Sequence, residues 1–453
     1  MNAVINYLRE NKEQYLQGLF DYIRIPSISS LPERREDMYR TANFLKQWLL
    51  KAGADKAEVY PTKGNPVAYA EKIIDPAKPT VLIYGHYDVM PVDPLSLWET
   101  EPFEPVIRDR KIFARGADDD KGQVFIQLAV FDAMVKTGFL PCNVKFMIEG
   151  EEEIGSPSLS LFCEENKEML KADIFLISDT AMISKDVSSI TVGLRGLCYM
   201  EVEVTGPDHD LHSGLFGGAV ANPANELAKI IAKLTDEKNR ICIPGFYDDV
   251  LEVSKEERAE MAKAPFNLEK YKKQLDINEV CGEEGYTTPE RTGIRPTLDV
   301  NGIWGGYIGE GSKTVLPSKA TAKISMRLVP NQDYEKIAVL FEKYIREITP
   351  PYVKVKVTAM HGGYPYVSPI DIPAYKAAVK AIEKTFGVLP VPFHSGGSIP
   401  IVSTFEKVIG VKSILMGFGL ETDATHSPNE NFDLDIFYKG METVAWFYHY
   451  FTE

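Results

Sequence analysis

Histidines and carboxylates gather in a few short polar segments of the chain. Four of these segments are YGHYDV (84–89), ARGADDDKGQ (114–123), IEGEEEIGS (148–156) and ISDT (177–180). Three of them follow short apolar runs typical of buried strands, and the Asp-rich one precedes a predicted helix. Because the carboxyl ends of parallel strands meet at one edge of a sheet, we expect these side chains to converge there. Mutual repulsion between so many carboxylates then requires a cation.

Each segment also has a simpler interpretation. A lone histidine after a strand, such as His86, is more often structural, although Asp88 points the same way two residues on and could orient its ring. One aspartate suffices to cap a helix, so the run Asp118–Asp120 exceeds that need. A charge run such as Glu151–Glu153 is usually a solvated face, but this one ends a predicted strand. A further polar segment, DATHSPNE, contains His426.

Two histidines with several carboxylates and no cysteine suit zinc or manganese. So many carboxylates could neutralise two divalent ions, which two-metal hydrolases hold around a shared bridging group. Such a centre makes hydroxide available at neutral pH, and a nearby carboxylate outside the ligand set can take the proton. The residues therefore predict metal-assisted hydrolysis. A dinucleotide fingerprint, a Walker sequence and a GxSxG elbow are all missing from the sequence.

Regular elements must position these segments, and the first part of the chain has an α/β pattern. Helical patterns lie at 2–23, 37–52, 121–138 and 157–170, and short apolar runs lie at 80–85, 143–150 and 173–179. Strands that alternate with helices predict a mostly parallel sheet covered by helices. The same pattern resumes near the end of the chain, with a strand at 411–417 and a closing helix at 435–451.

The middle of the chain has a different pattern. Segments 197–206 and 319–330 alternate apolar and polar residues with period two, which is typical of half-exposed antiparallel strands. Together with the helical patterns between and after them, they predict a smaller α+β domain inserted into the α/β domain. The segment 236–296 gives no clear pattern. The expected domains are a catalytic domain in two parts, 1–190 and 368–453, and an inserted domain, 191–367.

Composition excludes several classes of protein. The 453 residues carry a formal charge of −15, which argues against a general nucleic-acid binder and against docking on anionic lipid. We find neither a signal-peptide pattern nor an apolar stretch long enough to span a bilayer, so we expect a cytoplasmic protein. The odd number of scattered cysteines predicts small buried thiols in a reducing compartment. These are Cys142, Cys163, Cys198, Cys242 and Cys281.

Taken together, the motifs resemble the dinuclear-metal peptidases that include carnosine dipeptidases, bacterial dipeptidases, glutamate carboxypeptidase and aminoacylase. The resemblance extends from LFDYIRIPSIS (19–29) to THSPNENF (425–432). It is closest to the cytosolic carnosine-dipeptidase branch, because residues 85–123 are very similar to the signature of that branch. The family implies two divalent metal ions per subunit, zinc first and manganese as the alternative.

The resemblance also implies a role for each ligand residue. His86 and Asp179 would bind the first metal ion, and Glu153 and His426 the second. Asp119, the residue before the last Asp of ADDDKG, would bridge both ions. Asp at position 179 is typical of members that act on free-amino dipeptides, whereas several deacylases and the glutamate carboxypeptidase have Glu there. This residue therefore favours a dipeptidase.

Further residues would take part in catalysis, hold a ligand in place or bind the substrate. Glu152 would be the general base, and Asp88 would hold His86 through its second ring nitrogen. The inserted domain resembles the family's ferredoxin-like lid and dimerisation domain, in which His212 of LHSGLFGG would reach the partner's active site and bind the oxyanion. The remaining contacts would be Arg327, which would bind the substrate carboxylate, together with His361 and Ser398. A solvated loop histidine and a solvent-exposed arginine are the simpler interpretations of His212 and Arg327.

We therefore predict a two-metal dipeptidase that acts on small peptides as a homodimer. An N-acyl-amino-acid deacylase or a carboxypeptidase of the same family is the alternative enzyme. A non-catalytic relative that binds peptides would have lost a ligand or the base, and all six positions here carry usable residues. One departure concerns specificity: His394 and Ser395 stand where the branch commonly has Arg-Glu before GGSIP.

Overall fold

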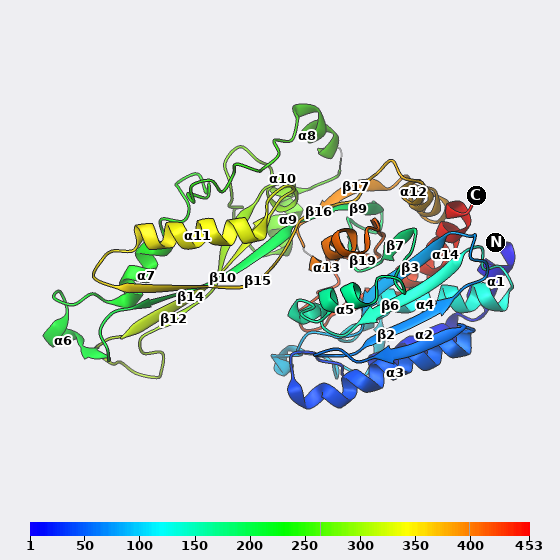
Figure 1. Ribbon diagram of the computed structural model, residues 1–453, viewed down its shortest axis with the longest axis horizontal. Helices are drawn as coiled ribbons and strands as arrows, with labels where there is room; N and C mark the ends of the chain where they lie inside the picture. Colours follow the sequence, from blue (N-terminus) through cyan, green and yellow to red (C-terminus); the bar gives the residue numbers. More distant parts are fainter. Residues whose placement is uncertain (263, 398) are drawn as a thin grey trace. The chain divides into compact units, whose positions relative to one another are not determined.

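The chain leaves its first structural unit after Val192 and returns to it at Ser368, as the colours of Figure 1 allow the reader to follow. This computed structural model describes residues 1–262, 264–397 and 399–453. Unit 1 comprises residues 1–192, 368–393 and 401–453, and unit 2 comprises residues 193–367 and 394–400. Most of unit 2 is thus one continuous insertion in the sequence of unit 1.

Unit 1 is built around a mixed sheet. Its strands follow the order β1 (Lys56–Tyr60), β2 (Val67–Lys72), β6 (Asn143–Glu149), β3 (Thr80–His86), β7 (Ile174–Ile177), β18 (Ser413–Leu415) and β9 (Ser189–Leu194). The central strands β6, β3, β7 and β18 pair in parallel. The β1–β2, β2–β6 and β18–β9 pairs are antiparallel. The expectation of a mostly parallel sheet is therefore wrong outside the four central strands.

The antiparallel edge has a local cause. A short connection, residues 61–66, joins β1 to β2, and a connection of this length permits only antiparallel pairing between neighbouring strands. Both strands also carry charged residues, as in KAEVY and VAYAEK, so their apolar pattern is weak. This weak pattern is why the sequence did not reveal them.

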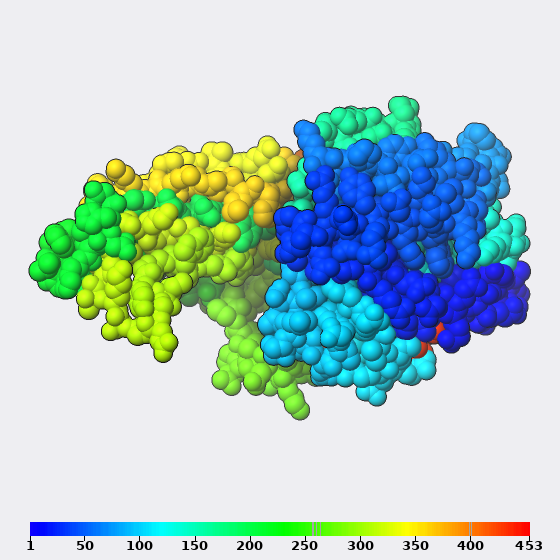
Figure 2. All heavy atoms as spheres, turned by 90° about the horizontal axis from the view of Figure 1, so that it is seen from below, coloured from blue at the N-terminus to red at the C-terminus, as the bar shows by residue number. Residues whose placement is uncertain are grey.

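Helices cover unit 1. They are α1 (Asn2–Glu10), α2 (Lys12–Ile23), α3 (Arg35–Ala52), α4 (Lys121–Lys136), α5 (Leu159–Glu165), α12 (Pro373–Phe386) and α14 (Leu434–Phe451). The predicted single helix over 2–23 is two helices, because the Asn11 side chain donates to the carbonyl of Tyr7 and closes α1 there. In Figure 2 the blue N-terminal segment forms much of the visible face of unit 1.

Helix α4 is the central helix of this unit. It packs against β3 and against α1, α2, α3 and α14, and nearly all of its residues are buried. Gly122 lies in its first turn, where an added Cβ would lie 1.8 Å from the carbonyl oxygen of Ala117. The backbone of the Asp-rich segment at Ala117 therefore lies directly against the first turn of the helix.

Unit 2 contains a four-stranded antiparallel sheet. The strand order is β12 (Thr297–Gly305), β14 (Lys319–Leu328), β10 (Gly196–Thr205) and β15 (Lys354–Gly363). Helices α7 (Pro223–Ile231) and α11 (Tyr334–Ile348) pack on it. Along the chain these elements follow the succession strand, helix, strand, strand, helix, strand, which is that of the split βαβ motif. Burial alternates along β10, as its period-two pattern predicted.

The segment without a clear sequence pattern joins α7 to β12. Its described residues form the short helices α8 (Lys255–Met261), α9 (Leu268–Gln274) and α10 (Thr288–Gly293). In the last part of this segment, Arg295 donates two hydrogen bonds of 2.7 Å to the buried carboxylate of Glu283. Among the described residues, helices of the length and apolar character needed to cross a bilayer are absent.

Gly122 provides a test of how closely the Asp-rich segment packs. Replacing Gly122 by Ala should lower the free energy of unfolding by about 3 kcal/mol, because the new methyl group would overlap a backbone oxygen that has no room to move. Helix propensity alone predicts the opposite sign. Urea unfolding followed by circular dichroism measures the difference.

Gly138, just after the end of α4, is the matched control. It has a φ of +68°, and an added Cβ would meet no other atom within 4 Å. Replacing Gly138 by Ala should therefore cost only about 1 kcal/mol, from the left-handed backbone. A Gly122→Ala variant as stable as the control would contradict the packing argument.

Candidate metal centre

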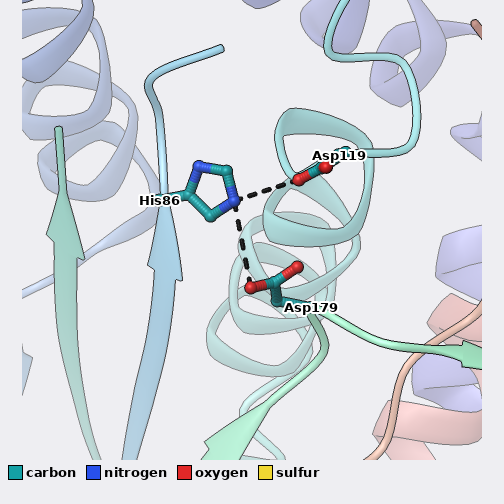
Figure 3. A group of neighbouring side chains, drawn as sticks. All are labelled: His86, Asp119 and Asp179. Carbon is teal, nitrogen blue, oxygen red and sulfur yellow. Dashed lines mark hydrogen bonds and ion pairs between the residues drawn. The ribbon is translucent and has the colours of Figure 1, made fainter. Parts of the chain in front are cut away.

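Four elements of unit 1 bring carboxylates and a histidine together. Strand β3 ends in His86, the single turn after β6 carries Glu152 and Glu153, and Asp179 follows β7. Because β6, β3 and β7 are parallel neighbours, these three ends lie at the same edge of the sheet. The segment before α4 contributes Asp119. Figure 3 shows Asp119 and Asp179 pointing towards the ring of His86.

The first group of possible metal ligands is His86, Asp119 and Asp179. The Nε2 atom of His86 lies 3.1 Å from Oδ1 of Asp119 and 3.9 Å from Oδ2 of Asp179. The His86 ring is fully buried, and both carboxylates are largely buried. One ligand atom from each residue lies within 4.8 Å of the others. This spacing leaves room for one ion between them.

Asp88 fixes the orientation of the His86 ring. The Nδ1 atom of His86 lies 3.0 Å from the carbonyl oxygen of Asp88 and 3.4 Å from its carboxylate. Since a carbonyl oxygen can only accept, Nδ1 carries the proton and Nε2 keeps its lone pair for the site when the ring is neutral. The Asp88 carboxylate also accepts from the backbone N–H groups of Glu152 and Glu153, at 3.2 and 3.1 Å. One aspartate therefore positions both the ring and the glutamate turn.

The second group of possible ligands is Asp119, Glu153 and His426. The Nε2 atom of His426 lies 2.9 Å from Oδ2 of Asp119 and 3.1 Å from Oε2 of Glu153. Asp119 thus presents one oxygen to each histidine and belongs to both groups. His426 has a left-handed backbone with φ of +60°, and 51% of its side chain is exposed. The site therefore opens to solvent on the side of His426.

Neighbouring acids in the two runs support the site without belonging to either group. Asp120 accepts the backbone N–H of His86 at 3.1 Å, and its side chain does not cap α4. Glu151 accepts from the backbone N–H groups of Asn65 and Ser158, at 2.9 and 3.0 Å. Sequence reasoning assigned neither residue. One sequence feature did point to them: each acidic run contains more carboxylates than the expected ligands and base require.

The electrostatics of the two groups reveal an excess of negative charge. Burial raises the pKa of Asp179 and Glu152, and it raises that of Glu153 to about 7. Hydrogen bonds with Asp119 and Glu153 raise the pKa of His426 to about 11. Burial opposes the ionisation of Asp119, but its bonds with His426 and His86 hold its pKa below the usual range.

A proton on His426 therefore partly neutralises the carboxylates of Asp119 and Glu153, and a divalent ion in the same place would do so as well. Two imidazole nitrogens and several carboxylate oxygens form a donor set that suits zinc or manganese. Asp120 also has a buried oxygen, Oδ1, without a hydrogen-bond partner. Excess negative charge, donor chemistry and spacing agree, so these residues fit two divalent metal ions.

Three other residues singled out in the sequence, His212, Arg327 and His361, belong to unit 2. His212 is exposed, and its Nδ1 accepts from the backbone N–H of Gly214 at 3.0 Å. Arg327 lies on β14, where burial lowers its pKa. His361 stacks on Tyr199 with ring centroids 4.9 Å apart, and burial and Arg327 lower its pKa. Ser398 lies outside the described residues.

Arg195 is a half-buried arginine of unit 2 that the sequence analysis did not select. Its Nε donates to the carbonyl of Gly396 at 2.9 Å, and its backbone N–H donates to Gly397 at 3.1 Å. Burial and the nearby Arg327 lower its pKa to about 10. Arg195 therefore holds the glycine segment that precedes Ser398.

The cysteines only partly match the expectation of buried thiols. All five are free; Cys142, Cys163 and Cys198 are buried, whereas Cys242 is partly exposed and Cys281 is exposed. The two exceptions lie in unit 2, in or beside the segment that gave no clear sequence pattern.

This fold and arrangement of residues define a peptidase. The profile of peptidase family M20/M25/M40 matches residues 82–449, and the chain belongs to this family. The family predicted from the motifs is therefore confirmed.

The relatives of the chain include metallodipeptidases. The Cys-Gly metallodipeptidase dug1 of Schizosaccharomyces pombe is 32% identical over 471 residues, which cover 99% of this chain and 98% of the relative. The Beta-Ala-His dipeptidase of Homo sapiens is 31% identical over 468 residues, with 99% and 92% covered. Among solved structures, the M20 family metallo-carboxypeptidase Sso-CP2 from Sulfolobus solfataricus has a TM-score of 0.89 and 36% identity, with 97% and 99% covered. The match to the carnosine-dipeptidase branch is confirmed.

Metal uptake should release protons. Binding needs a neutral His426 and an ionised Glu153, whereas without metal their pKa values are about 11 and about 7. The apparent affinity for Zn²⁺ should therefore rise between pH 6 and pH 8, by about tenfold per pH unit for each proton released. Calorimetry of Zn²⁺ binding in buffers of different ionisation enthalpy counts the protons.

Replacing His426 by Ala is the matched control for this measurement. The variant lacks the group whose pKa is about 11, so its binding should release one proton fewer. A binding heat that does not depend on the buffer would contradict the argument.

Proposed function

We propose that the chain is a two-metal dipeptidase that hydrolyses the peptide bond of dipeptides with Glu152 as the general base. The observation that carries this proposal is the sharing of Asp119 between two ligand groups, with Glu152 beside them. The names of the relatives, Cys-Gly metallodipeptidase and Beta-Ala-His dipeptidase, support a dipeptide substrate. Asp rather than Glu at position 179 supports it as well.

In this proposal His86, Asp179 and Asp119 hold one ion, and Glu153, His426 and Asp119 hold the other. We expect zinc, with manganese as the alternative, because the donor set lacks sulfur. When bound, the ions supply Lewis-acid polarisation of the scissile carbonyl and of a water molecule.

Glu152 moves the proton in the proposed mechanism. Its carboxylate accepts no hydrogen bond from the part of the chain that the structure describes, so it is available to a water molecule. Two cations nearby would lower its pKa from the raised value that burial produces and favour the ionised base. Glu152 would take a proton from the attacking water and give it to the leaving amine.

Residues of unit 2 would bind the substrate. Arg327 would bind the C-terminal carboxylate, since burial disfavours its charge and an anionic group would compensate for that cost. His361 and Ser398 would supply further contacts. His212 of the partner subunit would donate to the oxyanion, and unit 2 would act as the ferredoxin-like lid and dimerisation domain.

A panel of substrates tests the reaction class. We expect the enzyme to hydrolyse free dipeptides and to leave N-acetylated dipeptides and N-acetyl amino acids intact. Hydrolysis of N-acetyl amino acids would instead identify a deacylase. Release of the C-terminal residue from N-acetylated dipeptides would identify a carboxypeptidase, which the similarity to Sso-CP2 makes the second candidate.

The variant Glu152→Gln is the control for the panel. It should keep two metal ions and the same thermal midpoint, while kcat falls by about 10²–10⁴-fold because the amide cannot accept the proton. Elemental analysis and thermal unfolding check the first two properties. Activity near that of the unmodified enzyme would contradict the mechanism.

A homodimer follows from the proposed role of His212. Support comes from the edge strand β12 and the residues after it, where large apolar side chains lie exposed. Ile303 is 57% exposed and Ile308 89%. An exposed apolar edge strand can add a second copy of the same chain. The five free cysteines fit a cytoplasmic, reducing location.

Mixed dimers test whether the active site is shared. Chains carrying Glu152→Gln and chains carrying His212→Ala should each be nearly inactive alone. After mixing and subunit exchange, the heterodimer has one intact site, so activity should return to about a quarter of the unmodified level. Absence of recovery in heterodimers verified by mass spectrometry would contradict the shared site, and a monomer in sizing chromatography would contradict the dimer.

A further inference from the structure

A buried carboxylate outside both ligand groups, Glu430, accepts four hydrogen bonds from the segment that carries Asp119. Its Oε1 accepts from the backbone N–H groups of Asp118 and Asp119, both at 3.1 Å. Its Oε2 accepts from the backbone N–H of Gly116 at 3.0 Å and from Nη1 of Arg115 at 2.7 Å. Glu430 is fully buried. Four donors on one carboxylate fix the path of this segment.

The same residue also belongs to the loop that carries His426. The backbone N–H of Asn431 donates to the carbonyl of Asp423 at 2.8 Å and closes the base of this loop. At that base, the carbonyl of Glu430 accepts from the backbone N–H of Ala114 at 3.0 Å. Glu430 therefore joins the loop of His426 to the segment of Asp119 through both its side chain and its backbone.

Arg115 forms a buried ion pair with Glu430. Its side chain is 1% exposed, and its Nη2 donates to the carbonyl of Pro91 at 3.0 Å. Burial raises the pKa of Glu430, whereas Arg115 and the N–H of Gly116 favour the ionised form. Both oxygens of Glu430 already accept two hydrogen bonds each, so Glu430 has little capacity left to bind a metal ion directly.

We infer that Glu430 is a positioning residue of the metal centre, which sets the spacing between Asp119 and His426 so that both face the same ion. This inference rests on the proposed function, in which Asp119 and His426 are ligands. The distance that depends on Glu430 is the 2.9 Å between Oδ2 of Asp119 and Nε2 of His426. The group of Asp119, Glu153 and His426 therefore depends on Glu430 more than the group of His86 does.

The variant Glu430→Gln tests this role. In this variant an NH₂ group replaces one carboxylate oxygen, and this group cannot accept a hydrogen bond. The segment of Asp119 therefore loses at least one of the hydrogen bonds that fix it. The Zn²⁺ ion held by Asp119, Glu153 and His426 should then bind about 10–100-fold less tightly, as is typical when a partner that orients a ligand is lost. Competition with a chromophoric chelator measures both Zn²⁺ affinities on the full chain.

Activity as a function of free Zn²⁺ gives a second readout. The curve for Glu430→Gln should shift to higher Zn²⁺ by the same factor as the affinity, and kcat at saturating Zn²⁺ should recover. The variant Glu430→Asp keeps the charge next to Arg115 but is too short to reach all four donors, so it should fold and show a smaller shift. A merely structural role would lower the thermal midpoint without moving the Zn²⁺ curve.

Glu283→Gln is the matched control. Glu283 is also buried and bonded to an arginine, Arg295, through two bonds of 2.7 Å, but it lies in unit 2. This variant should lose thermal stability and keep both Zn²⁺ affinities. If the unmodified chain binds two ions and folded Glu430 variants bind them equally well, the inference about Glu430 is wrong. If the unmodified chain binds no Zn²⁺, the proposed function itself is wrong.

Discussion

The arrangement of the candidate metal centre in unit 1 depends on the carboxylate of Asp119. It lies between two imidazole rings and offers one oxygen to each. A buried carboxylate in this position needs positive charge nearby, and the hydrogen bonds that raise the pKa of His426 to about 11 favour a proton there in the absence of metal ions. The sheet order, the tight start of α4 and the closed loop of His426 all bring donors to this one group.

Part of the site could be predicted from the sequence because it follows from strand ends. His86, Glu153 and Asp179 lie after strands with clear apolar runs, and the parallel order of those strands brings their ends together. Strands β1 and β2 could not be found this way, since their charged residues weaken the pattern and their pairing depends on a short connection. The helix break at Asn11 likewise depends on one side-chain hydrogen bond.

The supporting residues were harder to predict for a different reason. Asp120, Glu151 and Glu430 act mainly on backbone N–H groups, and a backbone donor has no signature in the sequence. Arg195 holds backbone carbonyls in the same way. Candidate ligands can thus be recognised in a sequence by their residue type. The residues that orient them can be recognised only once the path of the backbone is known.

The insertion of unit 2 within unit 1 also imposes an order of events during synthesis. His86, Asp119 and Asp179 emerge from the ribosome before the inserted unit, and His426 emerges after it. All three members of the first group of possible ligands are therefore synthesised before the inserted unit, whereas the second group is complete only after it. The inserted unit thus separates in time the synthesis of the two groups that share Asp119.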